Sequence, residues 1–263
     1  MTKGFVFRIL LVGGCFLYVI WGIALDELWR SLQSMAPVGV GLTLLFILLN
    51  YILVGLRLKV ISREHIKLAT GINAGIFGIG MNNIFPAKLG EAAKTLYLSR
   101  AAEVGLAQSL GWVFWERFSD LNLLALLVLV AVLTVSIGGF AWPLFLLAGL
   151  LWGGLFLLAR VGRFVRLVQR LVMLPRLRIL VGDLADHLRG GLNVRFLVRV
   201  ALSALGVWVL YFLQYVLFLR LGAGLDLGIM QLLVVFVLAA GGMALPALPS
   251  GVGVYQAAVV VGL

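Results

Sequence analysis

The sequence predicts an all-α integral membrane protein, a polytopic bundle of helices, and three observations support this prediction. Hydrophobic residues make up 63% of the 263 residues and charged residues only 12%, whereas about a quarter of a water-soluble domain is charged. The apolar residues come in runs near the ~20 residues that a helix needs to cross a bilayer. Basic residues form short strips between these runs, as in cytoplasmic loops that face anionic lipid, which accounts for the net charge of +11 without nucleic acid.

The length allows about six to eight spans, in a single membrane domain over residues 1–263. The first apolar run follows two basic residues, and we interpret it as an uncleaved helix with its N-terminus inside rather than a signal peptide, because it is long and more spans follow. It contains Cys15, the single cysteine, so no intrachain disulfide can form. The expected spans are Ile9–Leu25, Pro37–Leu56, Leu121–Ile137, Trp142–Leu158, Phe196–Leu219 and Met230–Leu245.

The loop between the fourth and fifth spans fixes the orientation. Nine arginines lie within Arg160–Arg199, against two acids, Asp183 and Asp186, so we place this loop in the cytoplasm. Part of it, Phe164–Leu174, is expected to form an amphipathic helix on the membrane. The loop could hold anionic lipid, a partner protein or a second copy of the chain. The pattern is typical of a multi-pass protein of the bacterial cytoplasmic membrane.

The segment between the second and third spans starts and ends on the cytoplasmic side, so it crosses the membrane an even number of times or not at all. Its apolar part is short and rich in glycine, including the Gly71-x-x-x-Gly75 step that allows close helix contact. We therefore predict a re-entrant helical hairpin. It would enter along Thr70–Ile84, turn at Phe85-Pro86 and leave along Ala87–Arg100.

The turn of this hairpin, in the stretch NNIFPAKLGEAAKTLYLSR, is the first candidate site. Non-helical backbone at membrane depth needs a cover of protein or water, and a helix N-terminus there attracts anions. On the returning helix Lys88, Glu91 and Lys94 share one arc. The alternative is an interfacial helix with a solvated charged face, but the Asn82-Asn83 pair and the Pro-x-x-x-Gly step favour a site.

A second polar island, WVFWERFSDLNLL, precedes the third span. Glu116, Arg117 and Asp120 stand at helical spacing, so Arg117 can pair with Asp120 three residues on. Glu116 and Asp120 would repel each other unless a cation lies between them. Spacing alone does not separate a site from an interfacial anchor built on Trp112 and Trp115.

The end of the chain repeats the first pattern. The step Pro249-x-x-x-Gly253 has the spacing of Pro86-x-x-x-Gly90, and an Ala-Ala pair follows in both. A second re-entrant hairpin is therefore expected here, which would enter from outside if Met230–Leu245 does not fully cross. Two broken apolar segments in corresponding halves indicate an inverted-repeat transporter with a site near the midplane, although the match is short enough for coincidence. The chain stops inside an apolar run, so further C-terminal helices are expected.

Together these three stretches resemble the flippase-like transmembrane family of the lysylphosphatidylglycerol synthases, over roughly Arg57 to Leu263. The resemblance implies translocation between leaflets of a lipid with a phosphate head group, which could be aminoacylated. One position departs from the pattern, since the family's late Glu is Gln256 here. The family's patterns fall on Asn83, Pro86, Gly90 and Glu91, on Glu116, Arg117 and Asp120, and on Pro249, Gly253 and Gln256.

We expect a protein that is not an enzyme and that binds no cofactor, metal or nucleic acid. The two histidines, His65 and His187, lie far apart in basic loops. The first hypothesis is lipid translocation through a polar cavity. The expected partners are membrane lipids, and among these chiefly the anionic ones. A membrane-embedded scaffold and a secondary transporter of a small anion are the alternatives. The candidate substrate-binding residues are Asn82, Asn83, Pro86, Lys88, Gly90, Glu91, Lys94, Glu116, Arg117, Asp120, Pro249, Gly253 and Gln256.

Overall fold

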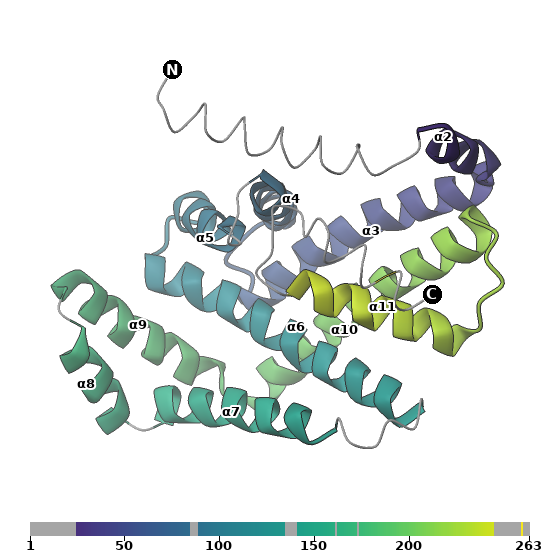
Figure 1. The fold of residues 1–263 in the computed structure, drawn as a ribbon. Coiled ribbons are helices and arrows are strands. Elements are labelled where there is room, and N and C mark those ends of the chain that lie inside the picture. The colour runs from purple at the N-terminus through teal and green to yellow at the C-terminus, as the bar shows by residue number, and fades with distance from the viewer. Residues whose placement is uncertain are drawn as a thin grey trace.

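The computed structural model describes residues 25–84, 89–134, 141–160, 162–172, 174–244 and 259, and every element within these ranges is a helix (Figure 1). The prediction of an all-α protein is confirmed. Three predictions fall outside the described residues. They are the first span up to residue 24, the turn at Phe85-Pro86 with Lys88, and the late motif with Pro249, Gly253 and Gln256.

The second, fourth, fifth and sixth predicted spans agree with the observed helices to within about five residues, and the third differs. There α6 begins at Leu106 rather than Leu121 and runs through the second polar island without a break, because the charged side chains of that island are paired inside the protein. The helices are α2 (Leu25–Ser34), α3 (Pro37–Ile61), α4 (Leu68–Ile84), α5 (Gly90–Ala101), α6 (Leu106–Thr134), α7 (Ala141–Arg160), α8 (Gly162–Leu171), α9 (Pro175–Gly191), α10 (Val194–Val216), the π-helical turn η2 (Leu217–Gly222) and α11 (Ile229–Ala244).

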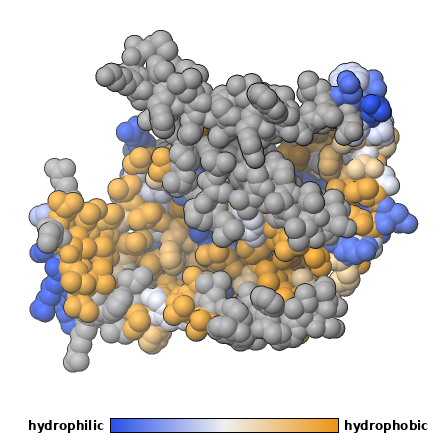
Figure 2. Space-filling model, in the orientation of Figure 1, coloured by the Kyte–Doolittle hydropathy of each residue, from blue (hydrophilic) through white to orange (hydrophobic). Residues whose placement is uncertain are grey.

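Two of the described helices are long and apolar enough to cross a membrane by themselves, α3 and the continuous segment Val194–Gly222 formed by α10 and η2. They pack against each other, and α3 begins with Pro37 at its first turn, where a missing N–H costs nothing. The surface has the distribution expected of a membrane protein. In Figure 2 hydrophilic residues lie along the outer edge of the α8–α9 end and around α2, and hydrophobic surface covers much of the area between, including part of the α8–α9 end.

Helices α4 and α5 form a hairpin at the side of the bundle. At ~1.5 Å per residue they are about 26 and 18 Å long, too short to cross a ~30 Å hydrocarbon core. Glycine allows α4 to pack closely against α3 and α5 to pack closely against α4. A Cβ on Gly71 would lie 2.6 Å from the carbonyl oxygen of Gly55 in α3, and one on Gly90 would overlap the carbonyl oxygen of Gly78. The chain thus folds back on itself at the predicted position.

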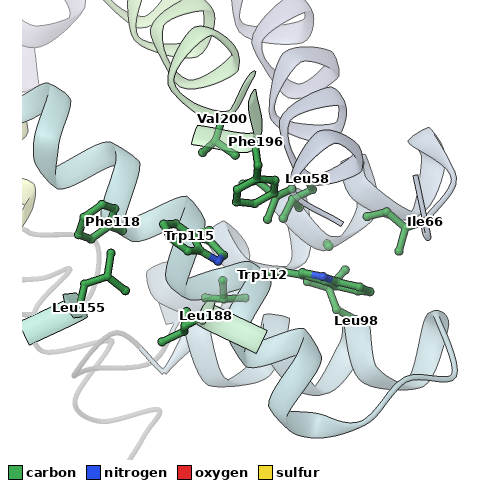
Figure 3. Close-up of a cluster of buried hydrophobic side chains, with 13 residues drawn as sticks. Leu58, Ile66, Leu98, Trp112, Trp115, Phe118, Leu155, Leu188, Phe196 and Val200 are labelled. Carbon is green, nitrogen blue, oxygen red and sulfur yellow. The ribbon is translucent and has the colours of Figure 1, made fainter. Parts of the chain in front are cut away.

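The main hydrophobic core joins α6 to its neighbours (Figure 3). Trp112 and Trp115 of α6 are 1% and 0% exposed and pack with Leu98 of α5, Leu188 of α9 and Phe196 of α10. The two tryptophans are therefore core residues, and the interpretation of the second island as an interfacial anchor is wrong for them. Their burial fixes the rotation of α6 and so the direction of the charged residues next to them.

Candidate functional site

Helix α6 presents two carboxylates one turn apart, and both are held by cations from other helices. Glu116 is 1% exposed. Its Oε1 accepts a hydrogen bond from Nη2 of Arg57 in α3, and its Oε2 accepts one from Nζ of Lys94 in α5 at 2.5 Å. Hydrogen bonds to charged groups are the strongest in proteins, and here they join three helices at one buried carboxylate.

Arg57 is the cation between the two acids. Its Nη1 donates to Oδ1 of Asp120 at 2.5 Å while its Nη2 reaches Glu116, so the planar guanidinium bridges the two carboxylates. Asp120 also accepts a hydrogen bond of 2.9 Å from the indole N–H of Trp208 in α10. The repulsion expected between Glu116 and Asp120 is thereby offset, and α10 is tied to the same cluster.

Arg117 and Glu91 form the outer edge of this cluster. Nη2 of Arg117 lies 3.1 Å from both Oε1 of Glu116 and Oδ2 of Asp120, and its Nη1 lies 3.6 Å from Oε1 of Glu91 in α5. The Arg117 side chain is 45% exposed and that of Glu91 28%. The second oxygen of Glu91, Oε2, is buried and has no hydrogen-bond partner in the part of the chain that the structure describes.

We call the six charged residues of the three preceding paragraphs the ion-pair cluster, and their charges balance. Three cations face three carboxylates across α3, α5 and α6. A single unpaired charge in a membrane interior costs ~2.5–3.5 kcal/mol or more, and breaking a buried pair leaves such a charge behind. A closed, neutral set of pairs is therefore the arrangement in which these helices tolerate six ionised side chains. Its members are Arg57, Glu91, Lys94, Glu116, Arg117 and Asp120.

The comparison with known proteins decides the family. A model of the lysylphosphatidylglycerol synthase TM region matches residues 5–263. The chain belongs to this family. The resemblance inferred from the sequence is therefore confirmed, and the chain is an integral membrane protein related to lipid handling. No match was found among curated proteins or among solved structures.

In this member of the lysylphosphatidylglycerol synthase TM-region family the two polar islands meet in the ion-pair cluster. Glu91 and Lys94 of the first island meet Glu116, Arg117 and Asp120 of the second. The cationic partner of Glu91 is Arg117, and the expected pairing of Arg117 with Asp120 is present.

Asn82 and Gly90 of the first island shape the hairpin. Oδ1 of Asn82 accepts a 2.8 Å hydrogen bond from the backbone N–H of Gly90, which joins the end of α4 to the start of α5. Gly90 is buried at this joint, and Asn83 is exposed. The contact between Asn82 and Gly90 thus positions the start of α5, which carries Glu91 and Lys94.

The sequence interpretation did not identify Arg57 and Trp208 as residues of this candidate site. Arg57 belongs by sequence to the basic strip that follows the second expected span, yet it is 2% exposed, whereas Arg63 in the same strip is exposed. One signal could have found it. Arg57 lies seven residues after Asn50, the other strongly polar residue of the apolar run, and that interval places both on one face of a helix.

Proposed function

We propose that the protein moves a phosphate-bearing lipid between the two leaflets, and that the head group binds at the ion-pair cluster. The observation that supports this is the uneven exposure of the cluster. Arg57, Lys94 and Glu116 have side chains 5% exposed or less, whereas Arg117 and Glu91 are 45% and 28% exposed. The inner pairs form a frame, and the outer pair can exchange partners with a ligand.

The chemistry of the outer pair suits a phospholipid head group. A guanidinium has a planar fork of N–H donors that matches phosphate oxygens. The pair between Arg117 and Glu91 is the longest in the cluster, at 3.6 Å, so a phosphate would displace it at the lowest cost. Glu91, released from Arg117, could then accept the ammonium group of an aminoacylated or other cationic head group. The charges stay balanced when the head group carries one phosphate and one ammonium charge, which keeps the barrier low in a medium of low dielectric.

The proposal includes a topology. The basic loops and α8–α9 face the cytoplasm of a bacterial cell, the N-terminus is inside, and the chain is multi-pass in the cytoplasmic membrane. The α4–α5 hairpin enters and leaves from the cytoplasmic side, which sets Glu91 and Lys94 at membrane depth. We propose transport without a covalent step, a cofactor or a metal.

Glu91→Gln is the variant that tests this function. Purified protein is reconstituted in liposomes that contain fluorescent lipids with different head groups, and the accessibility of each head group is followed from outside. We expect Glu91→Gln to slow translocation at least tenfold, about 1.4 kcal/mol. Its unfolding free energy should change by less than about 1 kcal/mol, because the pair with Arg117 is partly exposed.

Glu64→Gln is the matched control, because Glu64 makes an exposed ion pair of 2.8 Å with Lys59. It should transport at the wild-type rate. If Glu91→Gln also does so, the assignment of the site is wrong. If the wild-type protein moves no lipid of the panel but releases a trapped small anion, the protein is an anion transporter. Movement of neither would favour the scaffold.

A further inference from the structure

Helix α3 carries a stripe of buried polar residues along one face. Thr43, Asn50 and Arg57 stand at intervals of seven residues, and seven residues turn a helix by almost two full turns. Their exposures are 9%, 3% and 2%, in a helix that is otherwise mostly apolar. The stripe therefore runs from near the start of the helix, through its middle, to the ion-pair cluster near its end.

The stripe faces the interior of the protein between α10 and α4. On one side of it, Nε2 of Gln214 in α10 donates a 3.2 Å hydrogen bond to the carbonyl oxygen of Phe46. On the other side Val54 packs against Gly75 of α4. The opposite face of α3 is apolar and exposed, at Leu48 and Ile52, as expected where lipid covers a helix.

Asn50 differs from the other two residues of the stripe because its side chain has no hydrogen-bond partner among the residues that the structure describes. Both its Nδ2 and its Oδ1 are buried without a hydrogen bond. Thr43, by contrast, donates to the carbonyl oxygen of Gly39 at 2.8 Å, within its own helix. An unsatisfied buried polar group costs ~1–3 kcal/mol, which a leucine at this position would avoid. Nε of Arg57, on the same face, is also buried, and no described residue accepts a hydrogen bond from it.

We propose that Asn50 is a second binding station for the polar head group of the transported lipid, deeper in the bilayer than the ion-pair cluster. Seven residues at ~1.5 Å place it about 10 Å along α3 from Arg57. There the amide N–H donates to a phosphate or ester oxygen, and Oδ1 accepts from a hydroxyl or ammonium group. A head group that leaves the cluster thus finds hydrogen bonds near the middle of the helix. This inference rests on the proposed function and extends it.

The first test asks whether water and charge reach Asn50, independently of transport. Asn50→Cys and Val54→Cys are made in a Cys15→Ser background and treated with a small charged thiol reagent in the full-length reconstituted protein. The two positions are equally buried, at 3% and 4%, but Val54 packs against α4. Since only thiolate in contact with water reacts, Asn50→Cys should react roughly tenfold faster or more.

The second test measures translocation by Asn50→Leu. Leucine keeps the number and the branching of the side-chain heavy atoms and removes the unpaired amide, so thermal stability should be unchanged or higher. Translocation should slow about tenfold, the equivalent of one hydrogen bond lost from the bound head group. Thr43→Val is the matched control. It removes a hydroxyl from the same stripe, but one already bonded within its helix, so its rate should equal that of the wild type.

The outcomes separate this inference from the proposed function. Equal thiol reactivity at the two positions, or a wild-type translocation rate in Asn50→Leu, overturns the station at Asn50. If Glu91→Gln is inactive in that case, the lipid-transport function stands and only the deeper station fails. If the wild-type protein moves no lipid at all, both fail together. Should Asn50→Leu not fold, the thiol comparison alone decides.

Discussion

Two regions of the molecule hold arginines in opposite ways. In the ion-pair cluster Arg57 is 2% exposed and bridges two carboxylates on another helix. In α8, Arg166 and Arg170 are exposed beside the exposed apolar side chains of Leu167 and Leu171. The same residue type thus joins helices in one region and forms an amphipathic surface in the other. The partners of an arginine, and not the local charge, determine which role it has.

Desolvation explains the difference. A buried guanidinium loses its hydration, so it is stable only while its carboxylates stay ionised and in place. The arginines of α8 keep their hydration and can lie among anionic lipid head groups, with the leucines of the same helix in the acyl boundary. The cluster should therefore be sensitive to the loss of one group. The binding of α8 to the membrane should instead depend on salt concentration and lipid composition.

The largest effect that this comparison predicts follows from Glu116→Gln. The change leaves Arg57 and Lys94 buried beside a neutral amide, so we expect the unfolding free energy in detergent to fall by about 3–5 kcal/mol. Asp186→Asn in α9 is the control. Asp186 is paired with Arg189 at 2.9 Å but is 73% exposed, so its loss should cost less than about 1 kcal/mol. Similar losses in the two variants would contradict the distinction between the regions.

The helices themselves could be predicted from the sequence, because apolar runs of membrane length leave few alternatives. The spans expected at Pro37–Leu56 and Phe196–Leu219 are found as α3 and as α10 with η2. The hairpin helices also lie where the glycine-rich segment and the polar motif predicted them. The boundary of α6 was not predictable, since a polar island ends a hydropathy run even where the helix continues through it.

The candidate site could be predicted only in part. The spacing of Glu116 and Asp120 showed that a cation must lie between them, but it could not name Arg57, which comes from 59 residues earlier in the chain. Likewise the spacing of the second island fitted a site and an interfacial anchor equally well, and it did not show that Trp112 and Trp115 lie in the core. Local periodicity determines which residues share a face. Only tertiary packing determines which face meets another helix and which meets the head groups.

A smaller effect should follow from the arginines of α8. Leu171→Cys, in a Cys15→Ser background, carries an environment-sensitive fluorophore at a side chain that is 74% exposed. In vesicles with anionic lipid its emission should shift to the blue. Adding Arg166→Gln and Arg170→Gln should remove much of that shift, at about 1 kcal/mol for each arginine near the surface, as should high salt.

Arg30→Gln provides the control for this measurement, since Arg30 is exposed in α2 at the other end of the molecule (Figure 1). It should leave the emission unchanged. Emission that does not respond to lipid composition or to the α8 arginines would mean that a protein, either a partner or a second copy, covers this surface.

The smallest expected effect concerns the contact of α9 with α6. Helix α9 follows α8 in the chain, and α6 carries three residues of the ion-pair cluster. His187 lies against Gly111, where a Cβ would overlap its ring. Burial, followed by the positive charges of Arg63 and of His65, holds the pKa of His187 below its ordinary value. Arg63 itself is fixed, because it donates to the carbonyl oxygen of Gly190 and lies 5.0 Å over the ring of Phe196.

The pH dependence of stability follows from this lowered pKa. Between the folded value and the unfolded value near 6.5, the unfolded chain binds more protons than the folded protein, so stability rises with pH. The contribution is complete above about 6.5 and is lost as the pH falls through that value toward the folded pKa. We expect the thermal midpoint to decrease from pH 7.5 to 5.5, a range in which unperturbed carboxylates stay ionised. The decrease should be weaker in His187→Gln, whereas His65→Gln should change the slope less. If the thermal midpoint of His187→Gln depends on pH as strongly as that of the wild type, protonation of His187 does not loosen the packing of α9 on α6. In that case His187 does not couple the arginine-rich surface to the ion-pair cluster.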